Sequence, residues 1–366
     1  MAAYTTIDDP SAFFQVALHA SSNGNTITND GNSALKPDLI WSKGRSEPKY
    51  AGLYDSTRGV RKYLKASGGE TQVTADSGYD LTSFNTDGFS TGNNQYNTIC
   101  ANLSYVAWQW KANEGTRTTF SESGDNPGGG YQANTTAGFS IVDYTGTQAT
   151  GTVAHGLGDV PKFIMVKSLT ATRSWTIYHH KMGSPSNEKN MHLNTTAAMT
   201  DYNAEYWGGA TPTSSVFSLG NGHAVNYNNE SYIAYCWAEK QGYSKFGEYN
   251  GNGVVGDGPY IHTGFKPAFV MLKTTGIALD WFMYDHKRAG ANTVDARYNE
   301  IKSVIYANSI SGGSGSSYRG VDFCSNGFKI RNGGNGGPNQ ASQNYIYIAF
   351  AEHPQVTSTG IPATAR

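Results

Sequence analysis

The chain has 366 residues, a formal net charge of −1, and only 15% charged residues against 13% aromatic residues. Intrinsically disordered chains combine high charge with few aromatic side chains, so this composition excludes them and favours an ordered protein. The near-zero net charge also gives no electrostatic basis for binding nucleic acid or an anionic membrane surface.

The N-terminus and the cysteine content exclude further classes of protein. Residues 1–10, M-A-A-Y-T-T-I-D-D-P, contain neither the basic nor the apolar region of a secretory signal. No apolar run approaches the 18 residues that would indicate a transmembrane helix. We therefore expect a protein that is made in a cytoplasm without a signal peptide and is not inserted in a membrane. Cys100, Cys236 and Cys324 are too few and too scattered for a disulfide scaffold or a zinc site, so we predict no metal and no cofactor.

The first segments of the chain read as β-strands. Apolar and polar residues alternate at 14–18, which is typical of a strand with one buried face. An apolar run with a proline and a terminal lysine follows, K-P-D-L-I-W-S-K at 36–43, and then L-Y-D-S at 53–56. The run Y-V-A-W-Q-W at 105–110 ends this set as a closing strand.

The same set of segments recurs twice later in the chain. V-P-K-F-I-M-V-K at 160–167 and K-P-A-F-V-M-L-K at 266–273 repeat the apolar run, and 232–237 and 345–350 repeat the closing strand. A repeat of about 110 residues suits β-sandwich domains, which have about 100 residues. The sequence therefore predicts an all-β protein of three tandem homologous β-sandwich modules, and jelly-roll and concanavalin-like arrangements both fit. The predicted modules are residues 1–113, 136–240 and 241–366, with a Gly-rich linker at 114–135.

The central strands of the repeats are apolar on both faces. No position of Phe269–Leu272 is polar, and the strand at 232–237 carries apolar side chains on each side. Such strands are covered on both sides in folded proteins, and three equivalent apolar faces close most simply as a ring. We therefore expect the modules to pack around a pseudo-threefold axis. The alternative is an extended row of modules joined by a flexible linker. Residues 298–305 predict one short turn of helix.

A polar position is repeated beside these strands. Asp55, His179 and Asp285 occupy equivalent places in the three copies, and each is followed closely by a basic residue. We interpret them as a polar network within or between modules, with a receptor contact as the alternative. Because His179 and His180 are adjacent on a strand and face opposite sides, the pair does not indicate a metal site.

The candidate ligand site is an aromatic cluster in a polar loop of the second module. Tyr202, Tyr206 and Trp207 lie in D-Y-N-A-E-Y-W-G-G, a loop that the other modules do not share. Aromatic faces stack on the CH groups of sugar rings, while neighbouring Asn and Asp side chains bond the hydroxyls. The alternative for Trp207 is a core position or a plug between modules. The sequence contains no recognisable catalytic arrangement, so we predict that the protein is not an enzyme.

An ordered set of phrases along almost the whole chain resembles tail-fibre-like virion proteins of marine tailed phages, especially cyanobacterial phages. These phrases include K-P-D-L-I-W-S-K-G-R-S from residue 36, H-G-L-G-D-V-P-K-F-I-M-V-K from residue 155 and Y-I-Y-I-A-F-A-E-H-P from residue 345. The resemblance implies a virion structural protein made in the host bacterial cytoplasm. It implies other virion proteins of the tail or capsid as partners, but it implies no defined ligand. A role in host attachment would call for a host surface glycan or protein as receptor.

These observations together predict a tail fibre or tail-tip component that is exposed on the particle and involved in host attachment. The first alternative is a decoration protein of the capsid (head), which binds the shell and needs no receptor. The second is a glycan depolymerase. Such enzymes use two carboxylates in a groove, and the sequence offers no such pair.

Overall fold

A computed structural model of the chain describes residues 3–20, 24–96, 98–100, 103–288, 300–315, 319–331 and 336–362. Nearly all regular structure in these ranges is antiparallel β-sheet, which confirms the predicted all-β class. The helices among the described residues are three short ones: η1 (Pro10–Ala12), η2 (Ser186–Glu188) and α1 (His223–Asn226). None of the helices in these ranges is long and apolar enough to cross a membrane.

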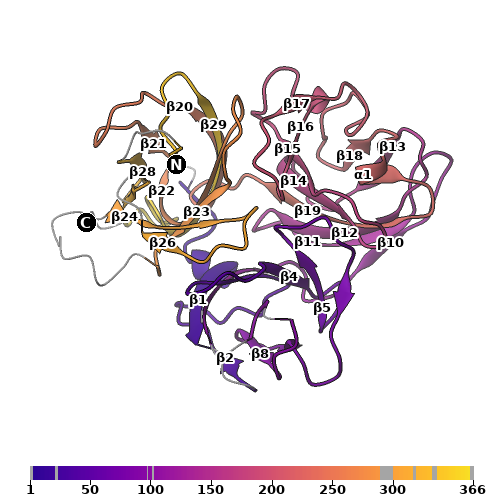
Figure 1. Cartoon of the computed structure of the whole chain (residues 1–366), viewed down its shortest axis with the longest axis horizontal. Coiled ribbons are helices and arrows are strands. Elements are labelled where there is room, and N and C mark those ends of the chain that lie inside the picture. The colour runs from indigo at the N-terminus through magenta and orange to yellow at the C-terminus, as the bar shows by residue number, and fades with distance from the viewer. Residues whose placement is uncertain are drawn as a thin grey trace.

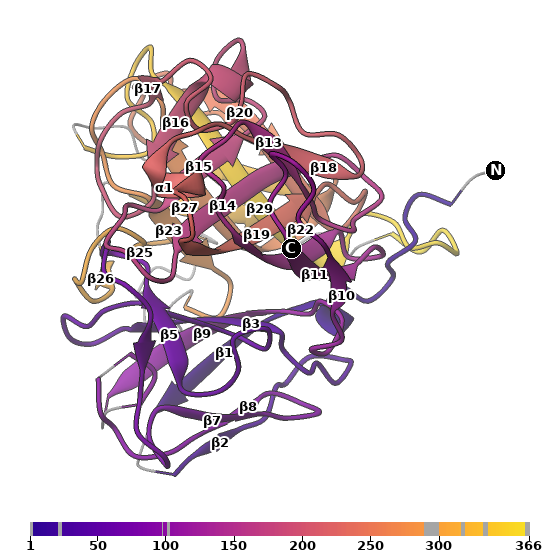
Figure 2. The same ribbon diagram turned by 90° about the vertical axis from the view of Figure 1, so that its right-hand side faces the viewer.

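The described strands form three lobes, each with one large sheet and one small sheet (Figure 1). In the first lobe the large sheet has the order β1 (Phe14–Ala20), β9 (Ser104–Trp110), β3 (Leu39–Gly44), β4 (Gly52–Asp55), β5 (Lys62–Lys65) and β6 (Val73–Thr74). Its small sheet has the order β2 (Thr26–Ile27), β8 (Phe89–Thr91) and β7 (Leu81–Phe84). Figure 2 shows this small sheet at the outer side of the lobe, away from the other two lobes.

The second lobe has the same central order of strands. Its large sheet runs β10 (Thr118–Phe120), β11 (Gly129–Asn134), β12 (Phe139–Thr145), β19 (Ser231–Ala238), β14 (Pro161–Ser168), β15 (Thr176–His179), β16 (Lys189–His192) and β17 (Thr200–Asp201). Its small sheet pairs β13 (Gly151–Ala154) with β18 (Val216–Leu219). In both lobes the apolar strand with the terminal lysine lies between the closing strand and the strand that ends in Asp55 or His179.

The third lobe repeats this order again. Its large sheet runs β20 (Ser244–Asn250), β29 (Asn344–Pro354), β22 (Phe265–Thr274), β23 (Phe282–Asp285), β25 (Ser303–Tyr306) and β26 (Ser314–Gly315). Its small sheet runs β21 (Tyr260–His262), β28 (Gly327–Ile330), β27 (Val321–Cys324) and β24 (Glu300–Ile301). Residues 300–306 are therefore strands β24 and β25, and the predicted helical turn is wrong there. Residues 298 and 299 lie outside the described part of the chain.

The predicted linker at 114–135 is also wrong in part, because it contains β10 and β11. These strands extend the large sheet of the second lobe beyond β12. Tyr131 and Ala133 pack against the core of that lobe. At Gly129 a Cβ atom would lie 2.0 Å from the carbonyl oxygen of Asp143, so the glycine permits close strand packing rather than flexibility.

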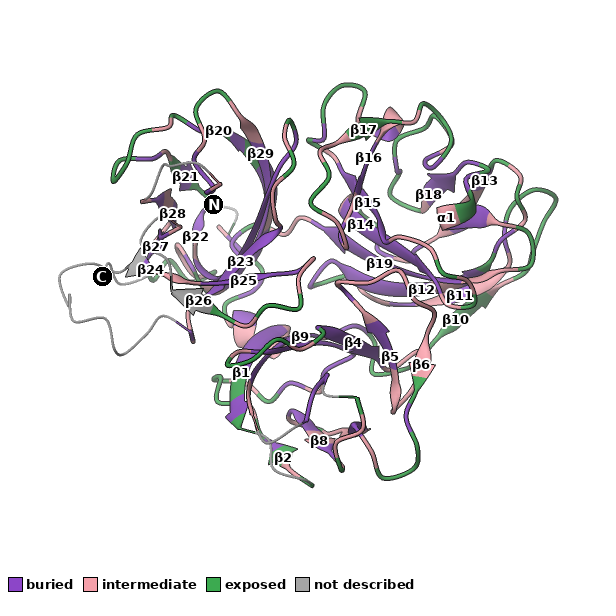
Figure 3. Ribbon diagram, in the orientation of Figure 1, coloured by how far each residue is buried: buried purple, intermediate pink, exposed green. Residues whose placement is uncertain are grey.

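The apolar side chains of the described residues form four clusters. Three clusters lie inside the lobes, between the large and small sheets. The fourth is a central core, which the large sheets of all three lobes share (Figure 3). Consecutive residues of a strand divide between the two, as Ile40 lies in the lobe core and Trp41 in the central core. This division explains why the strands are apolar on both faces.

At the middle of the central core, equivalent positions of the three closing strands meet. The ring of Trp110 lies 6.0 Å from that of Trp237 and 5.5 Å from that of Phe350, both edge to face. Burying a large apolar side chain contributes about 1.5–3 kcal/mol. The central core therefore holds the three lobes to one another. The lobes therefore surround a common centre and do not form a row.

Candidate functional site

The repeated polar position lies where the lobes meet. We name the contact of the first and second lobes the first seam, that of the second and third lobes the second seam, and that of the third and first lobes the third seam. At the first seam the Tyr235 hydroxyl donates to Asp55 Oδ2 at 2.7 Å, and at the third seam Trp108 Nε1 donates to Asp285 Oδ2 at 3.1 Å. At the second seam His179 Nε2 donates to the carbonyl oxygen of Tyr347 at 3.2 Å.

Asp55 and Asp285 each have a buried arginine three residues later. Arg58 Nε bonds Asp55, and Arg288 Nε bonds Asp285, both at 2.5 Å. At the second seam, where His179 replaces the aspartate, the corresponding arginine position holds the fully buried Met182. At this repeated pair of positions, aspartate and arginine therefore occur together or are both absent, which avoids an unpaired buried ion there. The predicted polar network between modules is thus confirmed.

A buried lysine marks the other end of each apolar strand. Lys43, Lys167 and Lys273 have no exposed surface. Each ammonium group donates to a main-chain carbonyl of a neighbouring lobe: Lys43 to Ser309 at 2.7 Å, Lys167 to Gly69 at 3.0 Å and Lys273 to Thr196 at 2.8 Å. Burial lowers the pKa of Lys43 to about 7 and the pKa of Lys167 and Lys273 to about 8. The three contacts run from first to third, second to first and third to second lobe, and so close a cycle.

The predicted aromatic cluster divides between the surface and the core. Tyr202 is half-buried and lines an open hollow of the second lobe with polar neighbours that include Asn203, Glu205 and His223. Its ring contacts that of Tyr206 edge to face, with centroids 4.8 Å apart. This hollow has the mixture of aromatic surface and hydrogen-bonding groups that was expected of a sugar-binding surface. The prediction of a ligand contact therefore stays open for Tyr202.

Trp207 lies inside the second lobe instead. Its ring is 2% exposed and packs edge to face on Tyr178 at 5.5 Å, and Nε1 donates to the carbonyl oxygen of Lys189 at 3.1 Å. Trp207 is therefore the core residue that was the alternative, and it does not face a ligand. Tyr206 is 8% exposed, its ring packs on that of Tyr202, and burial raises the pKa of its hydroxyl to about 12.

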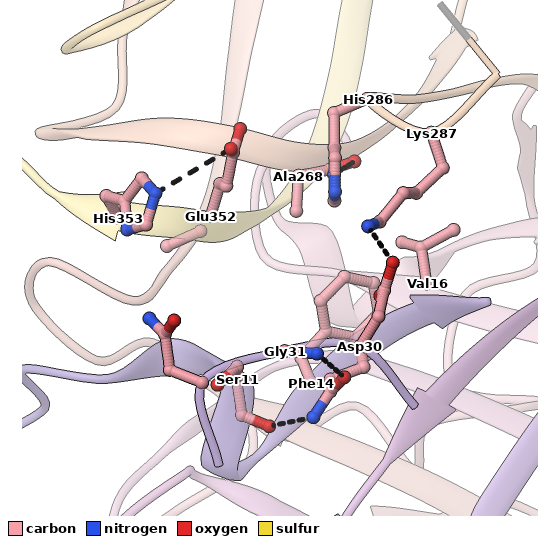
Figure 4. A pocket seen from close by; sticks show the side chains of 13 residues that line it. Ser11, Phe14, Val16, Asp30, Gly31, Ala268, His286, Lys287, Glu352 and His353 are labelled. Carbon is pink, nitrogen blue, oxygen red and sulfur yellow. Dashed lines mark hydrogen bonds and ion pairs between the residues drawn. The ribbon is translucent and has the colours of Figure 1, made fainter. Parts of the chain in front are cut away.

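A second concavity, which the sequence did not indicate, opens at the third seam. This seam cleft has a volume of about 190 Å³ (Figure 4). The first lobe lines it with Phe14, Val16 and the loop at Asp30, and the third lobe lines it with His286, Lys287, Ala268, Ala351, Glu352 and His353. Because its two walls come from residues more than 200 positions apart, only the closed ring creates it.

The adjacent histidines His179 and His180 form hydrogen bonds across the second seam. Among the described residues there is no group of three or more His, Cys, Asp and Glu side chains that could hold a metal ion. His179 and His180 instead donate to main-chain carbonyls of the third lobe, His180 to Phe246 at 2.8 Å. Burial lowers the pKa of both imidazoles, which keeps them neutral at these contacts.

The chain belongs to a protein family that is described as a domain of unknown function, DUF7483, which matches residues 9–354. The match includes the described strands of all three lobes. No curated protein and no solved structure matches the chain.

Proposed function

We propose that the protein is a structural component of a phage virion, in the tail fibre or tail tip, exposed on the particle and engaged in host attachment. The observation that carries this proposal is the closed ring of three similar large sheets within one chain. Such a ring presents similar surfaces three times around one axis, and it therefore suits docking on a threefold or sixfold part of a particle. The resemblance to tail-fibre-like virion proteins supports the same assignment.

The seams supply the rigidity that a virion component needs. All three large sheets contribute to the central core, and buried lysines and buried polar pairs bridge the seams. The N-terminal segment adds two side-chain hydrogen bonds across the third seam. The Tyr4 hydroxyl donates to Gly264 at 2.7 Å, and Thr5 Oγ1 donates to Gln241 at 2.8 Å.

The hollow at Tyr202 is the proposed receptor contact. A half-buried tyrosine with neighbouring amide and carboxylate groups suits a host surface glycan better than an apolar ligand. The proposal concerns Tyr202 as the contacting ring and Tyr206 as its support.

Locating the chain on purified particles tests the assignment. We expect a virion reconstruction, or gold labelling with an antibody to this chain, to place it on the tail. Label distributed over the capsid would replace the proposal with the decoration protein. Absence from purified particles would reject a virion role.

Phage that carry Tyr202→Ala test the receptor contact separately. We expect slower adsorption to host cells with unchanged particle yield, because the ring that lines the hollow is removed while the Trp207 core remains. Tyr260→Ala is the matched control, since Tyr260 is an exposed tyrosine, 45% accessible, of the third lobe. Equal adsorption of parent and Tyr202→Ala phage would remove the contact while leaving the virion assignment intact.

A further inference from the structure

The seam cleft is open because the third seam lacks side chains that fill the corresponding place in the first. There, Asp38 accepts hydrogen bonds from the main-chain N–H groups of Ala112 and Glu114, at 2.7 and 3.0 Å. Gln132 of the second lobe reaches across this seam and donates to Thr57 Oγ1 at 2.6 Å. In the third lobe the position equivalent to Asp38 is Ala268, whose small side chain leaves space.

The second seam is also closed at this place. Glu239 bonds Lys245 at 2.9 Å and accepts from the main-chain N–H of Phe246 at 3.2 Å. His180 donates across the seam to the carbonyl oxygen of Phe246. The equivalent residues of the third lobe, Glu352 and His286, border the cleft. The same positions of the repeat therefore form contacts across the second seam but line an open cleft at the third seam.

His286 presents a free acceptor to the cleft. Its Nδ1 lies 3.2 Å from the carbonyl oxygen of Ala268, and because a carbonyl can only accept, Nδ1 carries the proton. In the neutral ring Nε2 is then a bare acceptor, and Figure 4 shows the imidazole pointing into the cleft. Burial lowers the pKa of His286, against the opposing effect of Glu352 and Asp285, so the neutral ring prevails at neutral pH.

The charges around the cleft are balanced in pairs. Glu352 lies 3.0 Å from Lys266 and 3.7 Å from His353, and Lys287 lies 2.7 Å from Asp30. A charged ligand would have to disturb these pairs, whereas a neutral ligand would not. The walls offer acceptors in His286 and Glu352 and further N–H groups on Lys287, so they suit hydroxyl groups, which both donate and accept.

The remaining wall is apolar and the space is small. Phe14, Val16, Ala268 and Ala351 contribute carbon surface beside the polar groups. Sites for drug-sized ligands measure about 300–1,000 Å³, so a cleft of about 190 Å³ fits a single ring. We propose that the seam cleft binds one neutral sugar ring, with hydroxyls on His286 Nε2 and Glu352 and a CH face against the apolar wall. This site is separate from the Tyr202 hollow and does not depend on where the protein sits on a particle.

Binding can be tested on the full-length protein with neutral monosaccharides and myo-inositol as probes. We expect saturation-transfer NMR to detect binding of one or more of them, and the side-chain signals of His286 to shift on titration. His286→Leu should weaken binding at least about tenfold, since it removes the Nε2 acceptor. Glu352→Gln should also weaken binding, since it replaces the charged acceptor by a neutral amide. Glu239→Gln is the matched control, because Glu239 holds the same position in the second lobe, where the seam is closed.

The outcomes distinguish sugar binding in the seam cleft from binding in the Tyr202 hollow and from binding of a charged ligand. Binding that is lost in both cleft variants and kept in Glu239→Gln and Tyr202→Ala supports the proposal. Binding that is lost only in Tyr202→Ala places the sugar in the hollow and overturns it. The chemical class is wrong if methylammonium or glucuronate displaces the neutral probes or binds in their place. If no neutral probe shifts the His286 signals, the cleft is not a sugar site.

Discussion

The first and third seams differ from the second in the chemistry that they bury, although all three use the same positions of the repeat. The first and third seams bury an Asp–Arg pair whose aspartate accepts from a tyrosine or a tryptophan across the seam. In the second seam the residue opposite is Ile348, which has no donor, and His179 donates to a main-chain carbonyl instead. The acceptor side chain and its donor have therefore changed together.

This difference shows that the repeated polar residue is hydrogen-bonded across all three seams, whereas it carries a charge only in the first and third. Removing one partner of a buried ion pair leaves the other ion without solvent or counter-charge, which is strongly destabilising. His179 with Met182 occupies the equivalent place in the second seam without a formal charge at these two positions, because burial keeps the imidazole neutral. We expect the two kinds of seam to respond differently to substitution and to pH.

The largest expected effect is from Arg288→Met, which gives the third seam the methionine that the second seam has at the equivalent position, Met182. It leaves Asp285 buried without a counter-charge and should lower the free energy of unfolding by about 3–5 kcal/mol. Urea denaturation measures the loss. Met182→Leu is the control and should cost less than about 1.5 kcal/mol, because volume and polarity are conserved. Similar costs for the two variants would mean that the Asp–Arg pair has no special role.

Much of this arrangement could be predicted from the sequence. The apolar strands, their two buried faces and the equivalence of Asp55, His179 and Asp285 follow from residue patterns alone. Trp207 could not be placed, since a tryptophan beside two glycines in a polar loop suits either surface or core. Only the packing on Tyr178 shows which.

The segment at 114–135 and the seam cleft show a second limit. Glycine is common both in linkers and in tightly packed strands, so composition did not reveal β10 and β11. The cleft depends on Ala268 being small where Asp38 is not, and on two lobes meeting at that point. Such a site has no local sequence signal because its walls are distant in the chain.

A smaller effect is expected from the lysines, which all three seams share. The folded-state pKa of Lys43 is about 7, against 10.5 for an ordinary lysine. Between these values the unfolded chain binds a proton that the folded chain has released, so the free energy of unfolding rises with pH. Lys167 and Lys273 contribute a similar rise above about pH 8. We therefore expect Lys43→Met to reduce the slope between pH 7 and 9 by on the order of 1 kcal/mol per pH unit.

Urea denaturation of parent and variant at several pH values measures this difference in slope. Lys181→Met serves as control, since the Lys181 side chain is 46% exposed and pairs only at the rim of the second seam. Its slope should equal that of the parent. If Lys43→Met also keeps the parental slope, burial does not lower the pKa of Lys43 in the folded protein.

Acid should weaken the second seam through His179. The folded-state pKa of His179 is about 3, below the ordinary value of 6.5, so the unfolded chain binds the extra proton between these values. Stability is therefore lost as pH falls below 6.5, by about 1 kcal/mol from pH 6 to 5 for this group. His179→Gln, which keeps an N–H donor, should lose less over this interval. The exposed His262→Gln is the control and should follow the parent; identical acid profiles for all three proteins would exclude His179 as the sensitive group.

The smallest expected effect tests the comparison most directly, because it removes the Asp–Arg charges of the third seam and keeps one of the two N–H hydrogen bonds to position 285. In Asp285→Asn with Arg288→Met, the single amide oxygen can still accept from one of the two N–H groups that bond different oxygens of Asp285, which are Trp108 Nε1 on Oδ2 and the main-chain N–H of residue 288 on Oδ1. No unpaired ion remains, so this double variant should be more stable than Arg288→Met alone by at least about 1 kcal/mol, within the range of about 0.5–3 kcal/mol for contacting residues. Asp285→Asn alone completes the cycle. If the two substitutions simply add, the seams are held by shape and hydrogen bonding at independent positions, and the joint replacement of Asp and Arg in the second seam needs another explanation.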